Sequence, residues 1–271
     1  MLLSFTIQLQ EMLNYMNSPK INAKDIVEYE EYILDLTDIN TKRKSKAAVA
    51  MIFEMAIVNP NTAQFYALLC KVLEHRKVDS FSNFHQKVAF HCQDQLRRFG
   101  PVISLHIEDE RSLGLPLDYS TRPFDVKINL KMWRTWKDNL SSEKMIQRFR
   151  GMIQFIAELY NKGWFSVQGM HELLMLFTES IDEILIECLH NLVLLCGKKL
   201  DFYTRTFLSF AEMEEGKSHQ IVPINDYIQK IGVLSKTEQL SDNLKVKLAK
   251  LKEIYENNWD EKIVTNGPAK M

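Results

Sequence analysis

The chain contains little glycine and little proline. Its 271 residues include 9 Gly and 7 Pro, which disfavours both an all-β sandwich and a largely disordered chain. None of the four cysteines lies in a CxxC pair. We therefore expect reduced, mostly buried thiols in an intracellular, cytoplasmic protein, with a disulfide framework as the less favoured alternative. No apolar run reaches membrane-spanning length, and the apolar start at residues 1–5 lacks the flanks of a signal peptide, so no membrane partner is expected.

The sequence also lacks an excess of charge of one sign and the residue spacings that are typical of catalytic sites. The net charge of −1 excludes a protein that binds nucleic acid or membranes through its overall charge, although local basic clusters remain. Cys188 and His190 are two residues apart, so they do not share a helix face as a nucleophile and base would. No phosphate-binding glycine loop and no metal-ligand spacing occur. The sequence thus predicts a non-enzymatic protein without a cofactor.

What the chain does have is helical periodicity. In the segment around Arg148–Tyr160, apolar residues recur at i, i+3, i+4 and i+7, which is typical of an amphipathic helix. The same pattern predicts helices over most of the chain. Helices are predicted over residues 5–16, 22–36, 81–99, 143–160, 181–196, 202–213 and 222–234. Four more are predicted from part of their length: one runs from the basic run at 41–46 to Val58, and the others contain residues 65–73, 170–177 and 244–255. Ser18-Pro19, Asn59-Pro60 and Gly197 are predicted to end helices, Gly197 as a C-cap.

These segments arrive as about ten helices in pairs, with a pair spacing of roughly 40 residues, as in solenoids of the HEAT kind. We expect a single all-α domain over residues 1–260. Residues 101–140 form a long connection that contains Gly114, Pro116 and Pro123, and long connections in compact domains tend to be functional or disordered. Residues 261–271 are predicted to be a disordered tail.

Four motifs, in order along the chain, carry a resemblance to a known family. They are residues 52–60 with 66–70 (IFEMAIVNP, then YALLC), 153–159 (IQFIAEL), 187–201 (ECL, then GKKLD) and 257–259 (NNW). In this order they resemble the middle domain of translation initiation factor 4 gamma, over roughly residues 5–260. The resemblance implies a HEAT-like right-handed solenoid of about five antiparallel helix pairs, arranged as a crescent.

The resemblance also implies a function. A domain of this family binds a DEAD-box RNA helicase of the initiation factor 4A type, binds RNA weakly and supports translation initiation with other translation factors. The family usually has a highly charged helical linker where residues 101–140 here carry prolines and aromatics. An alternative therefore stays open: an adaptor of the same fold for mRNA decay, deadenylation or translational repression, recruiting another helicase or a deadenylase.

Two sets of residues are candidates for binding. Trp259 follows the last predicted helix and is a candidate partner-binding anchor, because aromatic anchors dominate interface energetics; the alternative is that it caps the solenoid core. Asn257 and Asn258 join it as partner-binding candidates, with helix C-capping as their alternative.

The second set is basic. The run Lys42, Arg43, Lys44 and Lys46 is a candidate for RNA phosphates, and its alternative is a solvated turn between helices. Arg148 and Arg150 lie near the predicted start of a helix, where cations oppose the helix dipole. They are candidates for RNA contact, with pairing to an acidic residue of the chain as the alternative.

Overall fold

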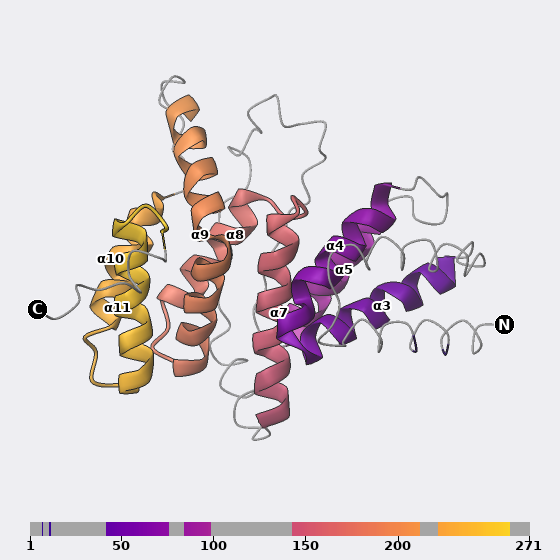
Figure 1. The fold of residues 1–271 in the computed structure, drawn as a ribbon, viewed down its shortest axis with the longest axis horizontal. Helices are drawn as coiled ribbons and strands as arrows, with labels where there is room; N and C mark the ends of the chain where they lie inside the picture. The colour runs from indigo at the N-terminus through magenta and orange to yellow at the C-terminus, as the bar shows by residue number, and fades with distance from the viewer. Residues whose placement is uncertain are drawn as a thin grey trace, which may run out of the picture. The chain divides into compact units, whose positions relative to one another are not determined.

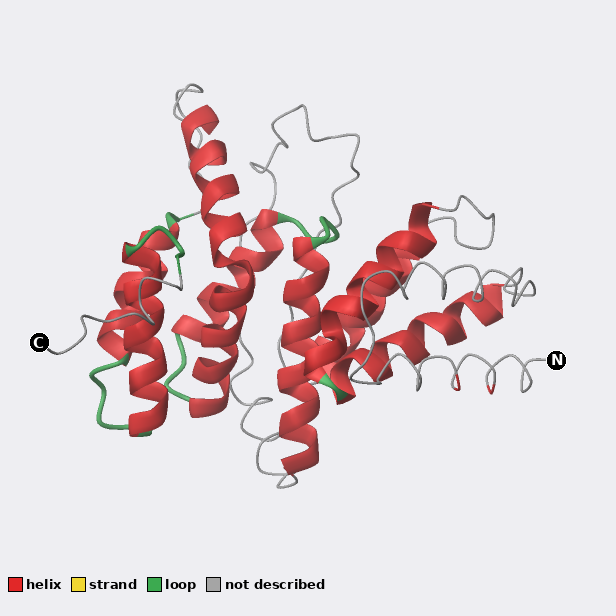
Figure 2. Cartoon of the chain, in the orientation of Figure 1, coloured by secondary structure: helices red, strands yellow, loops and turns green. Residues whose placement is uncertain are grey.

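The computed structural model describes residues 42–75, 84–98, 143–211 and 222–260, together with Ile7 and Glu11. Over these residues the regular structure is helical and contains no strand (Figure 2), which confirms the all-α prediction. The helices are α3 (Lys42–Val58), the 3-10 turn η1 (Pro60–Thr62), α4 (Ala63–His75), α5 (Phe84–Arg98), α7 (Glu143–Asn161), α8 (Val167–Thr178), α9 (Glu183–Ala211), α10 (Ile224–Leu234) and α11 (Asp242–Glu256). None of the helices in the described part combines the length and the apolar character needed to cross a membrane.

Several predictions lie outside the described residues. They concern the helices over 5–16 and 22–36, the connection 101–140 and the tail 261–271. Within the first of these ranges, Ile7 and Glu11 are helical. The described helices fall into two compact units, one with α3 to α7 and one with α8 to α11. The single domain over 1–260 stays a prediction.

The first unit is built on α7, which packs against α3 and α4. Its apolar stripe is buried as the periodicity predicts, with Met152, Phe155, Ile156 and Leu159 at 0% exposure. Gly151 lies on the same buried face, where α7 crosses α3. A Cβ on Gly151 would lie 2.1 Å from the carbonyl oxygen of Ile57, so only glycine allows this backbone approach.

The basic run is part of a helix. Helix α3 begins at Lys42, so residues 42–46 form its first turns and not a turn between helices. The apolar face of α3 follows directly, with Val49, Ile52 and Phe53 buried. The helix ends before Pro60, as the Asn59-Pro60 signal predicts, and Pro60 starts η1.

The second unit contains α8 to α11, in which α8 packs on α9 and α10 on α11. A buried polar contact joins three of these helices. The ring of His171 in α8 meets the Tyr227 hydroxyl of α10 at Nδ1 (3.1 Å) and the Thr204 hydroxyl of α9 at Nε2 (2.9 Å). Both ring nitrogens therefore have a partner in a place without solvent, since His171 is 0% exposed.

Helix α9 corrects the sequence analysis. We predict a helix that Gly197 closes, followed by a second one over 202–213, but Glu183–Ala211 is one helix of 29 residues. Figure 1 shows it continuous, with its C-terminal turns extending past the ends of α10 and α11. Gly197 lies inside α9 because a side chain is excluded there: a Cβ would lie 2.3 Å from Cη2 of Trp259. The glycine marks a close contact and not a helix end.

Candidate partner-binding site

The end of α11 is fixed by a Schellman motif. The amide of Trp259 donates to the carbonyl of Ile254 (2.8 Å), and the amide of Asn258 donates to that of Tyr255 (3.0 Å). Asn258 takes a left-handed conformation with φ 54°, which asparagine tolerates better than most residues. The side chain of Asn257 donates to the carbonyl of Glu253 at 2.8 Å. Asn257 and Asn258 therefore lie in the C-terminal cap of α11, which is the alternative given for them above.

Trp259 continues this turn at a local energetic cost. Its φ of 64° is unfavourable for a bulky residue, so the surrounding contacts must hold it. The indole packs on Gly197 of α9, and its ring meets that of Tyr255 edge to face at 5.4 Å. The indole Nε1–H donates to Oδ2 of Asp201 at 3.3 Å. Trp259 thus fastens the end of α11 to the middle of α9.

Asp201 links this contact to the surface. It is 7% exposed and accepts a hydrogen bond from Nε of Arg205 at 2.9 Å, with a second Arg205 nitrogen 2.9 Å from its other oxygen. The hydrogen bond and the negative charge of Asp201 raise the pKa of Arg205. We call the five residues of this arrangement the Trp259 cluster: Gly197, Asp201, Arg205, Tyr255 and Trp259.

The Trp259 cluster explains two of the sequence motifs. GKKLD supplies Gly197 and Asp201, and NNW supplies Trp259 together with its cap. The two motifs are halves of one contact, in which the glycine makes room for the ring and the aspartate binds its N–H. Trp259 is identifiable as a candidate from the sequence, whereas this role of Gly197 and Asp201 is not evident there. The signal that carries it is their joint presence in the family's motifs.

The Gly197–Trp259 contact gives a testable result. Gly197→Ala is expected to lower the free energy of unfolding by about 1–2 kcal/mol, because the methyl group must displace the indole and this overpacking exceeds the helix propensity gained. In a Trp259→Ala background the same change should instead be neutral or stabilise by up to about 1 kcal/mol. Urea unfolding of the four proteins measures both effects. An equal destabilisation in the two backgrounds contradicts the contact.

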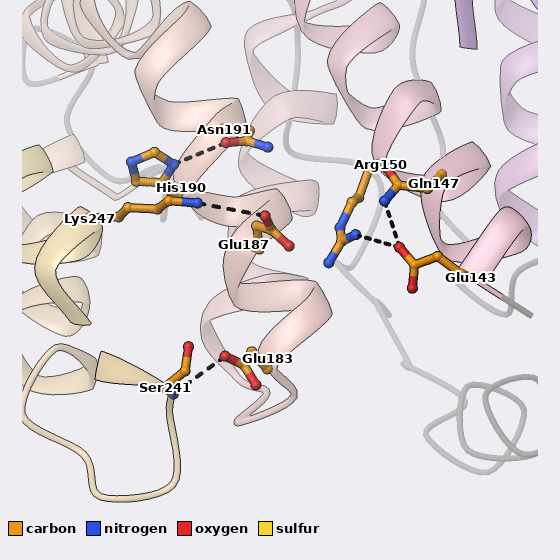
Figure 3. Close-up of polar contacts among 9 residues, drawn as sticks. All are labelled: Glu143, Gln147, Arg150, Glu183, Glu187, His190, Asn191, Ser241 and Lys247. Carbon is orange, nitrogen blue, oxygen red and sulfur yellow. Dashed lines mark hydrogen bonds and ion pairs between the residues drawn. The ribbon is translucent and has the colours of Figure 1, made fainter. Parts of the chain in front are cut away.

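The predicted RNA-binding arginines are engaged within the protein. Arg148 meets both carboxylate oxygens of Glu54 in α3, each at 2.7 Å. Arg150 lies 3.4 Å from Glu143, which also accepts a hydrogen bond from Gln147 (Figure 3). Both arginines lie beyond the first turn of α7, where the helix dipole has little effect, so the expected conflict with the dipole is absent. Contact of Arg148 and Arg150 with RNA stays a prediction.

Lys46 is the described side chain of the basic run, and it is exposed; for Lys42, Arg43 and Lys44 the structure describes the helix only. Sequence reasoning missed the basic end of α5, where Arg97 and Arg98 are exposed. Burial lowers the pKa of His91; the negative charges of Asp94 and Glu54 raise it, and the charges of Arg98 and Lys46 lower it. Charges of both signs from α3 and α5 therefore act on this ring.

Polar contacts also connect α11 and the segment before it to the first half of α9 (Figure 3). The amide of Ser241, which precedes α11, donates to Glu183 at 3.3 Å. Lys247 lies 3.9 Å from Glu187, a distance that adds little stability for partly exposed charges. These contacts orient the helices and do not form a reacting centre.

No cluster of three or more His, Cys, Asp or Glu side chains among the described residues has the geometry of a metal site. The four cysteines are buried free thiols, as expected. Burial raises the pKa of Cys70 and of Cys92, which disfavours the reactive thiolate.

Comparison with known proteins agrees with the motifs. The sequence profile of the MIF4G domain matches residues 8–263. The chain is 23% identical over 238 residues to mouse eukaryotic translation initiation factor 4 gamma 1, covering 85% of this chain and 13% of that protein. It is 22% identical over 273 residues to mouse eukaryotic translation initiation factor 4 gamma 3, covering 97% of this chain and 16% of the relative. The human protein of that name matches at 22% over 272 residues.

The chain spans about one sixth or less of the length of these relatives. The profile crosses both compact units and includes the Trp259 cluster. The described helices agree with the all-α, HEAT-like fold of this domain, which confirms the predicted fold class. The chain belongs to the MIF4G domain family.

Proposed function

We propose that the chain is a non-enzymatic, cytoplasmic scaffold for mRNA-related complexes that binds a DEAD-box RNA helicase of the initiation factor 4A type and supports translation initiation. The match to the MIF4G domain over residues 8–263 carries this proposal. The similarity to initiation factors 4 gamma 1 and 4 gamma 3 supports the link to translation.

The end of the second unit is the proposed partner-binding surface. Asn258 is exposed, and Trp259 keeps part of its surface accessible beside it. The cap and the Trp259 cluster hold both residues in one conformation before a partner arrives. Preorganised side chains lose less entropy on binding, which favours affinity. The partner would contact Asn258 and the accessible part of Trp259, with Asn257 fixing the turn.

The proposed mechanism is differential affinity. A DEAD-box helicase alternates between arrangements of its two lobes, and a scaffold shifts this equilibrium only by binding one arrangement more tightly. The proposed scaffold favours the arrangement that releases product and rebinds ATP. The predicted cations Lys42, Arg43, Lys44, Lys46, Arg148 and Arg150 would add weak contacts to RNA phosphates.

Capture of a purified 4A-type helicase tests the surface. Trp259→Ala is expected to weaken binding at least tenfold, because buried aromatic anchors dominate such interfaces. Asn258→Gly is expected to weaken it several-fold without loss of stability, since glycine accepts the left-handed φ and removes only the exposed side chain. Binding is measured by titration of the full chain.

Val246→Ala is the matched control, because Val246 is 67% exposed and lies on α11 as well. This variant should bind like the unmodified chain. Unchanged affinity of both Trp259→Ala and Asn258→Gly would remove the partner-binding role from this surface. No binding by the unmodified chain would reject the 4A-type helicase as partner.

A second function remains a candidate because the identity to the initiation factors is only 22–23%. An adaptor of the same fold for mRNA decay, deadenylation or translational repression would recruit another helicase or a deadenylase. Capture of a decay-type helicase or a deadenylase subunit, with no capture of the 4A-type helicase, is the result that favours it.

A further inference from the structure

The C-terminal half of α9 carries two aromatic side chains on its surface. Phe202 is 65% exposed and Tyr203 is 38% exposed. Their rings contact each other edge to face, with centroids 5.5 Å apart. Large exposed aromatic residues are costly to keep in water, and two that touch on a rigid helix form a preformed surface.

Cations surround these rings. Nζ of Lys199 lies 5.7 Å from the centroid of the Tyr203 ring. Lys198 is exposed one helical turn before Phe202. Arg205, three residues after Phe202, is 68% exposed and is held in place by Asp201. We call these five residues the aromatic platform: Lys198, Lys199, Phe202, Tyr203 and Arg205.

We propose that the aromatic platform binds single-stranded RNA, with bases stacked on Phe202 and Tyr203 and phosphates beside Lys198 and Arg205. This inference rests on the proposed mRNA-related function and adds a contact that the basic run and the α7 arginines do not provide. Aromatic rings combined with cations bind single strands without a sequence preference, because every base has a face that stacks.

The surroundings of Phe202 favour a strand of RNA over an apolar protein surface. Apart from Tyr203, the described residues one helical turn away from Phe202 are Lys198, Lys199, Arg205 and Thr206, which are all polar. The core of a protein interface needs a contiguous apolar patch that excludes charge. A base needs only one ring face, and its phosphate is bound by the flanking cations. The platform has this alternation of aromatic and cationic groups along one helix.

Fluorescence anisotropy with labelled 12-nucleotide U and A strands tests the proposal on the full chain. The double variant Phe202→Ala/Tyr203→Ala is expected to bind both strands about tenfold more weakly. Phe202→Leu keeps apolar bulk but has no aromatic face, so it should also bind more weakly. Lys198→Gln should lower the slope of log affinity against log salt by about 0.7 for the phosphate contact it removes.

Phe90→Ala is the matched control, because Phe90 is 63% exposed on α5. It should leave RNA affinity unchanged, and urea unfolding should show that the platform variants fold, since their side chains are exposed. Unchanged RNA affinity of the double variant overturns the proposal, as does an equal loss for duplex RNA. A loss of helicase capture with intact RNA binding also overturns it, by identifying the platform as a protein surface.

The two proposals fail separately. If the unmodified chain does not bind RNA, the platform proposal is rejected, while capture of the helicase still decides the scaffold. If the chain binds RNA through the platform but captures no helicase, the platform proposal holds and the helicase is rejected.

Discussion

Gly151→Ala is expected to destabilise the first unit by about 3 kcal/mol, a loss at the upper end for overpacking. The added Cβ would lie 2.1 Å from the carbonyl oxygen and 2.8 Å from the carbonyl carbon of Ile57. Backbone atoms cannot rotate away as a side chain does, so α7 and α3 must separate. The contacts made across this crossing would then be strained, including the ion pair of Arg148 with Glu54 and the hydrogen bond from Gln154 to the Pro60 carbonyl.

The matched control is Gly232→Ala in α10. The atoms nearest to a Cβ at Gly232 belong to the flexible side chain of Lys252, with Cδ at 3.4 Å and Cε and Nζ at 3.9 Å. This change should therefore be neutral or stabilise by up to about 1 kcal/mol through helix propensity. Urea unfolding at pH 7 compares the two. A Gly151→Ala protein as stable as Gly232→Ala would show that α3 and α7 do not approach closely at this point.

The second large effect is on the pH dependence of stability. Burial lowers the pKa of His171 to about 4, whereas an exposed histidine titrates near 6.5. Between these values the unfolded chain takes up a proton that the folded chain does not, so stability falls as the pH falls. The neutral ring contributes fully above about pH 6.5, and about 3 kcal/mol is lost on reaching pH 4.

Urea unfolding at pH 7, 6, 5 and 4.5 measures this loss, and His171→Gln provides the comparison. The variant is less stable at pH 7, because the contacts to Tyr227 and Thr204 are disturbed, but its stability should depend less steeply on pH. A residual slope is expected from His91 and His190, whose pKa values burial also lowers. Identical slopes for both proteins would contradict a neutral, buried His171.

The helices were predictable from sequence because their buried apolar residues recur with the period of a helix. The buried stripe of α7 and the Asn59-Pro60 stop follow from local spacing alone. Gly197 shows where such reasoning fails. A glycine after an apolar run is typical of a helix end, but here the glycine makes room for the ring of Trp259, which is far away in the sequence. Local patterns do not identify the residue that fills the space beside a glycine.

The candidate site was predictable in part. Trp259 and its two asparagines stand out locally, and the structure places them in one cap. The partner of Arg148 is Glu54, which is 94 residues away, so charge near a helix start did not reveal it. The buried His171 was also missed, because its two hydroxyl partners come from other helices. Contacts between side chains that are far apart in the sequence become visible only in the folded structure.

The proposed scaffold binds a 4A-type helicase and changes its ATPase cycle. The most direct measurement is the RNA-dependent ATPase rate of that helicase as the full chain is titrated in, with Asn258→Gly in parallel. We expect a saturable rise in the rate for the unmodified chain, and for the variant a rise that needs several-fold more protein. A rate that stays constant at saturating concentrations of the chain, or one that rises identically for the variant, would contradict the proposal.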